Sequence, residues 1–261
     1  MLRFSSSLKK VQPSQAGERL DRASRYRHRA MPDWERRLHE MMRVTWPCES
    51  SLEFQALWPS VSCRANGNVH KLGAPADNDD GEIGLSRAIW CLTRHLQPRT
   101  VVECGVGTGL HARFVLEALA LNRAGHLYSI EPPAADPASR GLVGLAVEPR
   151  AAQRWSLFAD SSRRALPELL SRIGMVDMIV YDSPGLNHET HFEINLAWSA
   201  LKPGGVMVVD DIDVNGAYQF FIERHPDYRA LVCGAEPLRP GGPSPETNRQ
   251  FAILFKTQAP R

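Results

Sequence analysis

An α/β fold with a mostly parallel sheet is predicted for this chain of 261 residues. Short apolar runs alternate with helical patterns from about residue 82 to residue 224, which is typical of a parallel sheet with helices on both faces. Three glycines follow the first of these runs, in "VVECGVGTG", and mark a strand-to-helix turn. The last two strand candidates are joined by a loop without a helix, so we expect them to pair antiparallel at one edge.

The first 78 residues predict a basic, partly helical extension that serves as a lid or a tail, and residues 79–261 predict the main domain. A helix is expected at 33–45, with Asp33 as its N-cap and Trp34 and Leu38 on its apolar face. The stretch 66–82 is polar and rich in Gly, Asn and Asp, which predicts a loop between the two parts.

Each element of the main domain has its own periodicity. Apolar residues at helical spacing predict helices at 82–96, 109–121, 162–172, 188–201 and 216–224. Short runs rich in β-branched and aromatic residues predict strands at 100–104, 126–131, 154–159, 176–181, 206–210, 228–234 and 251–256.

The composition argues against a membrane-spanning protein and against a protein stabilised by disulfides. The chain is 43% hydrophobic, and no stretch approaches the roughly 18 apolar residues of a membrane span. Without a recognisable secretion signal, a cytoplasmic protein is expected. The five cysteines contain no C-x-x-C pair, which argues against a disulfide framework and a structural zinc site. We therefore expect reduced, mostly buried thiols.

Lys and Arg are in excess over Asp and Glu in residues 1–45. A nucleic-acid-binding arm, a surface for an acidic partner, an organelle transit peptide and a solvated tail all have this composition. Aromatic and glycine residues do not interleave with the charges, so a solvated tail is favoured and nucleic acid is disfavoured as a partner. The sequence leaves a homo-oligomer open.

Acidic residues stand at or next to the carboxyl ends of the predicted strands, where open sheets of this kind bind ligands. They are Glu103, Glu131, Asp160, Asp182, Asp210 and Asp211. The glycine turn lets the backbone approach a ligand closely and offers the positive end of the next helix. Its third glycine comes one residue too early for the dinucleotide fingerprint, which weakens a nicotinamide cofactor.

The ordered segments "VVECGVGTG", "YSIEPP", "FADSSRRALPEL", "VDMIVYDSPG" and "ALKPGGVMVVDDID" resemble class I S-adenosylmethionine (SAM)-dependent methyltransferases. The resemblance covers about residues 79–261 and implies a Rossmann-like, seven-stranded sheet whose last strand is antiparallel. It also implies cofactor contacts. These are Glu103, Gly105, Gly107 and Gly109 around the methionine moiety, Glu131 on the ribose, Asp160 with Ser161 near the adenine, and Asp182 beside the cofactor.

Asp182, Asp210 and Asp211 follow two strands that would be neighbours about 4.8 Å apart. Three converging carboxylates repel one another, and a hard divalent cation such as Mg²⁺ relieves the repulsion. Both Asp210 and Asp211 can face such a cation only if the strand ends between them.

The arrangement resembles metal-dependent O-methyltransferases of the catechol and macrocin kinds. This implies a small-molecule hydroxyl as acceptor, and metal ligation by Asp182, Asp210 and Asp211. The macrocin-like pattern commonly has a histidine about three residues after the first aspartate, whereas this chain has Pro184 and Gly185 there. His188 is the hypothesis for a catalytic general base, together with Asp182 as a second catalytic residue.

Other interpretations stay open. Glu103 can accept backbone N–H groups, Asp160 can cap the helix at 162, and Asp211 or Asp213 can cap the helix at 216. His188 can be a solvent-facing residue at a helix start. At the level of function, the alternatives are a metal-independent class I methyltransferase acting on nitrogen, carbon or a macromolecule, a nicotinamide enzyme, and a noncatalytic adaptor that keeps the fold.

Overall fold

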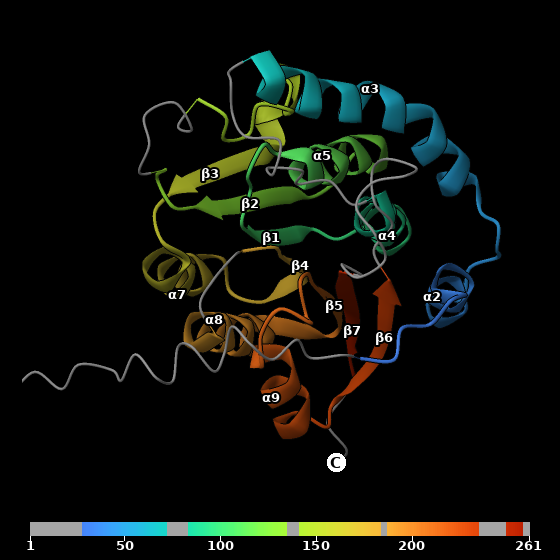
Figure 1. Cartoon of the computed structure of the whole chain (residues 1–261), viewed down its shortest axis with the longest axis vertical. Helices are drawn as coiled ribbons and strands as arrows, with labels where there is room; N and C mark the ends of the chain where they lie inside the picture. The colour runs from blue at the N-terminus through green and yellow to red at the C-terminus, as the bar shows by residue number, and fades with distance from the viewer. Residues whose placement is uncertain (1–27, 72–82, 135–140, 184–186, 235–248, 258–261) are drawn as a thin grey trace, which may run out of the picture.

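A seven-stranded sheet runs through the middle of the molecule (Figure 1). The computed structural model describes residues 28–71, 83–134, 141–183, 187–234 and 249–257. The strands are β1 (Thr100–Cys104), β2 (His126–Glu131), β3 (Trp155–Ala159), β4 (Val176–Tyr181), β5 (Leu201–Val209), β6 (Tyr228–Gly234) and β7 (Gln250–Lys256). Their order across the sheet is β3-β2-β1-β4-β5-β7-β6.

Strands β1 to β5 pair in parallel, and β7 pairs antiparallel with both β5 and β6. The predicted seven-stranded, mostly parallel sheet with an antiparallel last strand is confirmed. The chain order reverses between β1 and β4, and open α/β sheets bind ligands beyond the carboxyl ends of the strands at such a point.

Helices cover both faces of the sheet, as predicted (Figure 1). One face packs against α4 (Ile83–Leu96) and α5 (Leu110–Asn122), with α2 (Trp34–Met42) beside them. The other face packs against α7 (Ser162–Ile173), α8 (Asn187–Ala200) and α9 (Ala217–Arg224). A short 3-10 helix, η1 (Pro149–Arg154), leads into β3.

Helix α3 (Glu49–Lys71) adds a further layer outside α4 and α5 (Figure 1). Phe54 and Val61 are buried in a cluster with Phe114 of α5, and Trp58 stacks on the same phenylalanine with ring centroids 5.7 Å apart. The extension is therefore packed on the main domain through aromatic side chains.

The loop predicted at 66–82 is partly wrong, because α3 continues to Lys71. Once the packed part of a helix has formed, each added residue costs little, so α3 extends through a segment whose composition favours a loop. The rest of that predicted loop, 72–82, lies outside the described residues, as do residues 1–27 of the basic extension. The predicted strand 206–210 is also too short. Strand β5 begins at Leu201, which pairs with Val176 ahead of a register shift.

Candidate cofactor and metal site

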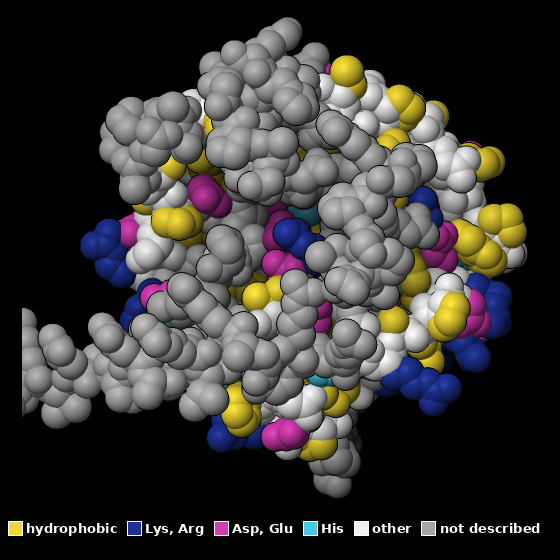
Figure 2. All heavy atoms as spheres, viewed as in Figure 1, with side chains coloured by type: hydrophobic (Ala, Val, Ile, Leu, Met, Phe, Trp, Pro, Cys, Tyr) yellow, Lys and Arg dark blue, Asp and Glu magenta, His cyan; other side chains and the backbone are white. Residues whose placement is uncertain are grey.

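The residues that follow three neighbouring strands meet at one edge of the sheet. Beyond β1, Gly105 donates its N–H to the carbonyl of Ile130 at 3.0 Å, and beyond β4, Asp182 donates to Cys104 at 2.8 Å. Beyond β5, Asp210 donates to Tyr181 at 2.9 Å. Backbone pairing thus continues one residue past each strand and brings the side chains that follow to the same edge. Figure 2 shows acidic side chains, a basic side chain and a histidine gathered near the middle of one face.

The turn after β1 requires glycine for packing inside the protein. Gly105 has φ +87°, and a Cβ there would lie 1.8 Å from the carbonyl oxygen of Asp182. Gly109 has φ +83°, and a Cβ there would lie 2.8 Å from the Cα of Gly144. Gly107 also has a positive φ, +50°. All three glycines thus have a positive φ, and Gly105 and Gly109 also let the turn fit closely against its neighbours.

Glu131 at the end of β2 holds this glycine turn. Its Oε2 accepts the N–H of Val106 at 2.6 Å and the N–H of Gly107 at 3.3 Å. A carboxylate has two acceptor oxygens, and both of these hydrogen bonds from the turn use Oε2.

The segment that follows β2 packs over the other side of the turn. Gly144 donates its N–H to the carbonyl of Gly107 at 3.0 Å, and Ala146 donates to Thr108 at 2.8 Å. The buried Arg113 of α5 pairs with Glu148 at 2.8 Å and so ties this segment to the helix. The turn is therefore held from two sides by the protein itself.

Glu103, in β1 just before the turn, is fully buried. Its Oε2 accepts the hydroxyl of Ser129 at 2.5 Å, and the same hydroxyl accepts the indole N–H of Trp155 at 2.9 Å. Its Oε1 is buried without a hydrogen-bond partner among the described residues. Burial raises the pKa of Glu103 to about 7. A buried acceptor without a donor fits a ligand that brings a positively charged N–H group.

Asp160 follows β3 and forms hydrogen bonds with the start of α7. Its Oδ1 accepts the N–H of Ser161 at 2.7 Å and the guanidinium of Arg164 at 2.9 Å. The hydrogen bond from Arg164, with that from the Ser161 backbone, lowers the pKa of Asp160. Ser161, not Asp160, is the N-cap residue of α7, and it makes no side-chain capping bond.

Three aspartates follow β4 and β5. The Oδ2 of Asp182 lies 3.0 Å from Nδ1 of His111, a buried residue in the first turn of α5. The Oδ1 atoms of Asp210 and Asp211 are buried without a hydrogen-bond partner among the described residues. Arg249 lies beside this group, with its Nε 3.9 Å from Oδ1 of Asp211.

Burial is the main cause that raises the pKa of Asp210 well above its ordinary range, and the charges of Asp182 and Asp211 raise it further. Burial also raises the pKa of Asp211, and the nearby Arg249 opposes this rise. Hard oxygen donors that repel one another in this way suit a divalent cation.

The sequence condition was that the strand ends between Asp210 and Asp211, whereas in the structure it ends before both of them. Strand β5 ends at Val209, and Asp211 has a left-handed φ of +51°, so Asp210 and Asp211 do not alternate as strand residues. Neither Asp211 nor Asp213 caps α9, since its first N–H is accepted by Asn215 and Asp213 accepts the N–H of Gln250.

The three aspartates are nevertheless not a closed set of ligands in this structure. Within the described ranges, one group of three or more His, Cys, Asp and Glu side chains has all its ligand atoms within 4.8 Å of one another, and it consists of His39, Cys48 and Cys91. A cation shared by Asp182, Asp210 and Asp211 therefore requires rotation of these side chains.

His188 is exposed in the first turn of α8, and Pro184 and Gly185 before it lie outside the described residues. Sequence reasoning missed two residues of the site, Ser129 against Glu103 and Arg249 against Asp211. Ser129 had a signal, because its strand position pairs with Glu103 in the β1–β2 register. His111 was expected near the cofactor, because it stands just past Gly109, but without a chemical role; the structure places it against Asp182.

In this structure acidic side chains surround a glycine turn at the carboxyl edge of the sheet, where open α/β sheets bind their ligands. Residues 102–212 match the model of a family described as a methyltransferase domain. This match supports the predicted resemblance to SAM-dependent methyltransferases.

Solved structures share this fold. The O-methyltransferase TomG of Streptomyces achromogenes, involved in tomaymycin synthesis and solved with SAM, is 17% identical, with a TM-score of 0.57 over 87% of this chain and 100% of its own. An O-methyltransferase of Bacillus cereus in complex with S-adenosylhomocysteine is 14% identical, with a TM-score of 0.55 over 84% and 96%. A methyltransferase of Podospora anserina, also bound to S-adenosylhomocysteine, is 12% identical, with a TM-score of 0.54 over 89% and 99%.

A comparison with curated protein sequences finds no match. In the part of the chain that the structure describes, no helix combines the length and the apolar character that crossing a bilayer demands.

Proposed function

We propose that this chain transfers the methyl group of SAM to a hydroxyl of a small molecule, with help from a divalent cation. The observation that carries the proposal is Glu103, a fully buried carboxylate with an unpaired oxygen directly before a glycine turn. SAM has no phosphate and carries an ammonium and a sulfonium, so a site built from carboxylates suits it. The methyltransferase domain match over residues 102–212 supports the same cofactor.

In this proposal, Glu103 and the turn Gly105–Gly109 bind the methionine moiety. The Oε1 of Glu131 accepts a ribose hydroxyl, while Oε2 keeps holding the turn. Asp160 and Ser161 border the adenine, and Asp182 borders the reacting end of the cofactor. A hydrogen bond to a charged acceptor contributes about 1.5 to 3 kcal/mol, so Glu131 is the residue whose loss should be felt most directly.

The cation, when bound by Asp182, Asp210 and Asp211, lowers the pKa of the acceptor hydroxyl and orients it. His188 is kept as the candidate base, although it must turn from solvent to reach an acceptor. His111 holds the carboxylate of Asp182 in place through its Nδ1. The reaction is a direct displacement at the methyl carbon, so positioning of the two substrates accounts for much of the rate.

A second candidate is methyl transfer without a metal. Arg249 already offers a positive charge to Asp211 and opposes the rise of its pKa. In that case the acidic group serves the cofactor and the acceptor directly, and the acceptor can be nitrogen, carbon or a macromolecule.

Calorimetric titration with S-adenosylhomocysteine tests the cofactor site. We expect Glu131→Gln to weaken binding at least about tenfold, because glutamine can still accept the N–H groups of the turn but lacks the charge. Glu168→Gln, an exposed glutamate of α7, is the matched control and should bind as the parent does. Equal affinities for the parent and Glu131→Gln would refute the assigned site.

The acceptor and the metal are tested with catechols and sugar hydroxyls, by measuring S-adenosylhomocysteine formation with Mg²⁺ and with EDTA. We expect turnover to disappear with EDTA and to return with Mg²⁺, and Asp210→Asn to remain inactive under both conditions. Turnover that survives EDTA in the parent would establish the metal-independent alternative. Cofactor binding without turnover on any acceptor would favour the adaptor.

A further inference from the structure

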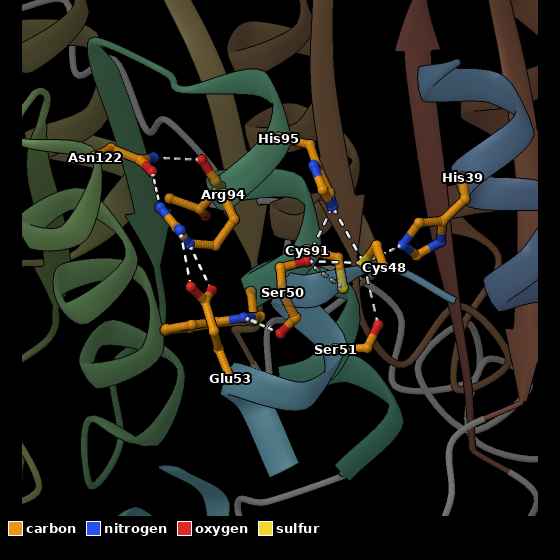
Figure 3. A network of polar contacts seen from close by, with 11 residues as sticks. His39, Cys48, Ser50, Ser51, Glu53, Cys91, Arg94, His95 and Asn122 are labelled. Carbon is orange, nitrogen blue, oxygen red and sulfur yellow. Dashed lines mark hydrogen bonds and ion pairs between the residues drawn. The ribbon is translucent and has the colours of Figure 1, made fainter. Parts of the chain in front are cut away.

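A second group of metal-binding side chains lies far from the acidic edge in sequence, between the N-terminal helices and α4. His39 comes from α2, Cys48 directly precedes α3, and Cys91 and His95 lie one turn apart on α4 (Figure 3). His39, Cys48 and Cys91 are all buried. Their ligand atoms lie within 4.8 Å of one another, and the side chains point toward a common centre (Figure 3).

Both histidines lie close to the sulfur of Cys48, although His95 falls outside the group of three whose ligand atoms all lie within 4.8 Å of one another. Nε2 of His39 lies 3.0 Å from Sγ of Cys48, and Nε2 of His95 lies 3.3 Å from the same sulfur. Around tetrahedral Zn²⁺, with Zn–S of about 2.3 Å and Zn–N of about 2.0 Å, neighbouring S and N ligands lie about 3.5 Å apart. Small side-chain rotations therefore convert the observed contacts into coordination.

The surroundings orient the ligands in the way that metal sites do. Nδ1 of His39 donates to the backbone carbonyl of Glu35 at 2.7 Å, which leaves Nε2 unprotonated and aimed at Cys48. Metal-binding histidines almost always carry such a hydrogen bond on the other ring nitrogen. The hydroxyls of Ser50 and Ser51 lie 3.0 and 3.2 Å from Sγ of Cys48, where they can stabilise a thiolate.

The position of Cys48 favours the thiolate form. It stands at the N-terminus of α3, a helix of 23 residues, where the helix dipole stabilises negative charge. Thiolate sulfur and imidazole nitrogen together are the donor set that selects Zn²⁺.

We propose that His39, Cys48, Cys91 and His95 bind one Zn²⁺ in a structural site. Four protein ligands leave no open position for a substrate, and three of the four are buried. The ion links α2 and the start of α3 to α4, so it fastens the N-terminal helices to the methyltransferase domain. The proposal is independent of the reaction proposed above.

The sequence argued against a structural zinc site because zinc sites are recognised in a sequence by closely spaced cysteines, and this chain has none. All five cysteines are free, and four of them are buried, as expected. The ligands, however, come from α2, from the residue just before α3 and from α4, and Cys91 and His95 are the one pair at helical spacing. The exposed Cys63 in α3 stands outside the cluster and provides a matched control.

The test is the zinc content of the full-length protein after exposure to a weak chelator, measured by inductively coupled plasma mass spectrometry. We expect one zinc ion per chain in the parent and in Cys63→Ser. Cys91→Ser and His39→Gln should lose the metal, since removal of even a supporting residue weakens metal binding about 10- to 100-fold. Asp210→Asn should keep its zinc, which separates this site from the acidic edge.

A second measurement does not depend on how the variants fold. The reduced, metal-free parent is titrated with Co²⁺, and we expect a thiolate-to-metal charge-transfer band that saturates at one equivalent and is displaced by Zn²⁺. Absence of this band overturns the proposal. So does zinc retained by Cys91→Ser, or a Cys48–Cys91 disulfide found by mass spectrometry in untreated protein.

Discussion

Glu103→Gln is predicted to change how the stability of the protein depends on pH. Burial raises the pKa of Glu103 from its ordinary 4.5 to about 7 in the folded state. An acid with a raised pKa destabilises the fold once it ionises, so the cost is absent below pH 4.5 and complete above pH 7. With 1.36 kcal/mol per pKa unit, the cost grows by about 2.5 kcal/mol between pH 5 and pH 8.

Glutamine removes this titration while keeping the shape and an acceptor for the hydroxyl of Ser129. Urea unfolding of the parent and the variant at pH 5 and pH 8 measures the effect. We expect the stability of Glu103→Gln relative to the parent to rise by about 2.5 kcal/mol over that interval. Any constant cost of the exchange cancels in the comparison, and Glu168→Gln at an exposed position checks the method. A difference that does not change with pH would refute the argument that Glu103 is a buried, unpaired acid.

Three further predictions concern the turn, the acidic edge and α3. Gly105→Ala should lower the free energy of unfolding by at least about 2 kcal/mol, because its Cβ would overlap the carbonyl of Asp182. The control Gly174→Ala, at a glycine with a similar φ and open space around it, should lower it by only about 1 kcal/mol. Equal losses in thermal unfolding would disprove the overlap. Asp210→Asn should stabilise the metal-free protein increasingly as pH rises above 3.8, because the raised pKa of the carboxyl group makes its ionised form unfavourable in the fold. Mg²⁺ should raise the melting temperature of the parent more than that of the variant. A gain in stability that does not depend on pH would contradict this prediction. Trp58→Ala should cost about 2 kcal/mol through the lost stacking on Phe114, and an unchanged denaturant midpoint would mean that α3 is not docked there.

The sheet could be predicted because its strands are short apolar runs that end in turns. The strands at 100–104, 126–131, 176–181 and 228–234 were predicted with the bounds that the structure gives. The antiparallel pairing of β6 with β7 followed from the missing crossover helix between them. Local patterns of this kind depend on the residues of one element and need no knowledge of its neighbours.

Helix α3 could not be predicted, because its stability comes from contacts with α4 and α5 and its own sequence contains Pro59 and several poor helix formers. The residues of the candidate site likewise fall into those that the sequence predicts and those that only the fold reveals. The acids at the strand ends were visible in the chain, whereas the partners that complete them, His111 and Arg249, come from positions that only the fold brings near.

Strand β7 lies between β5 and β6, although β6 precedes it in the chain. During synthesis, one edge of β5 therefore stays without its neighbour until residues 250–256 have been made, about forty residues after β5 itself. An open apolar edge invites pairing with other chains. The nascent protein consequently depends on protection of that edge, by a chaperone or by rapid completion, and truncation before β7 should yield aggregates instead of a smaller active enzyme.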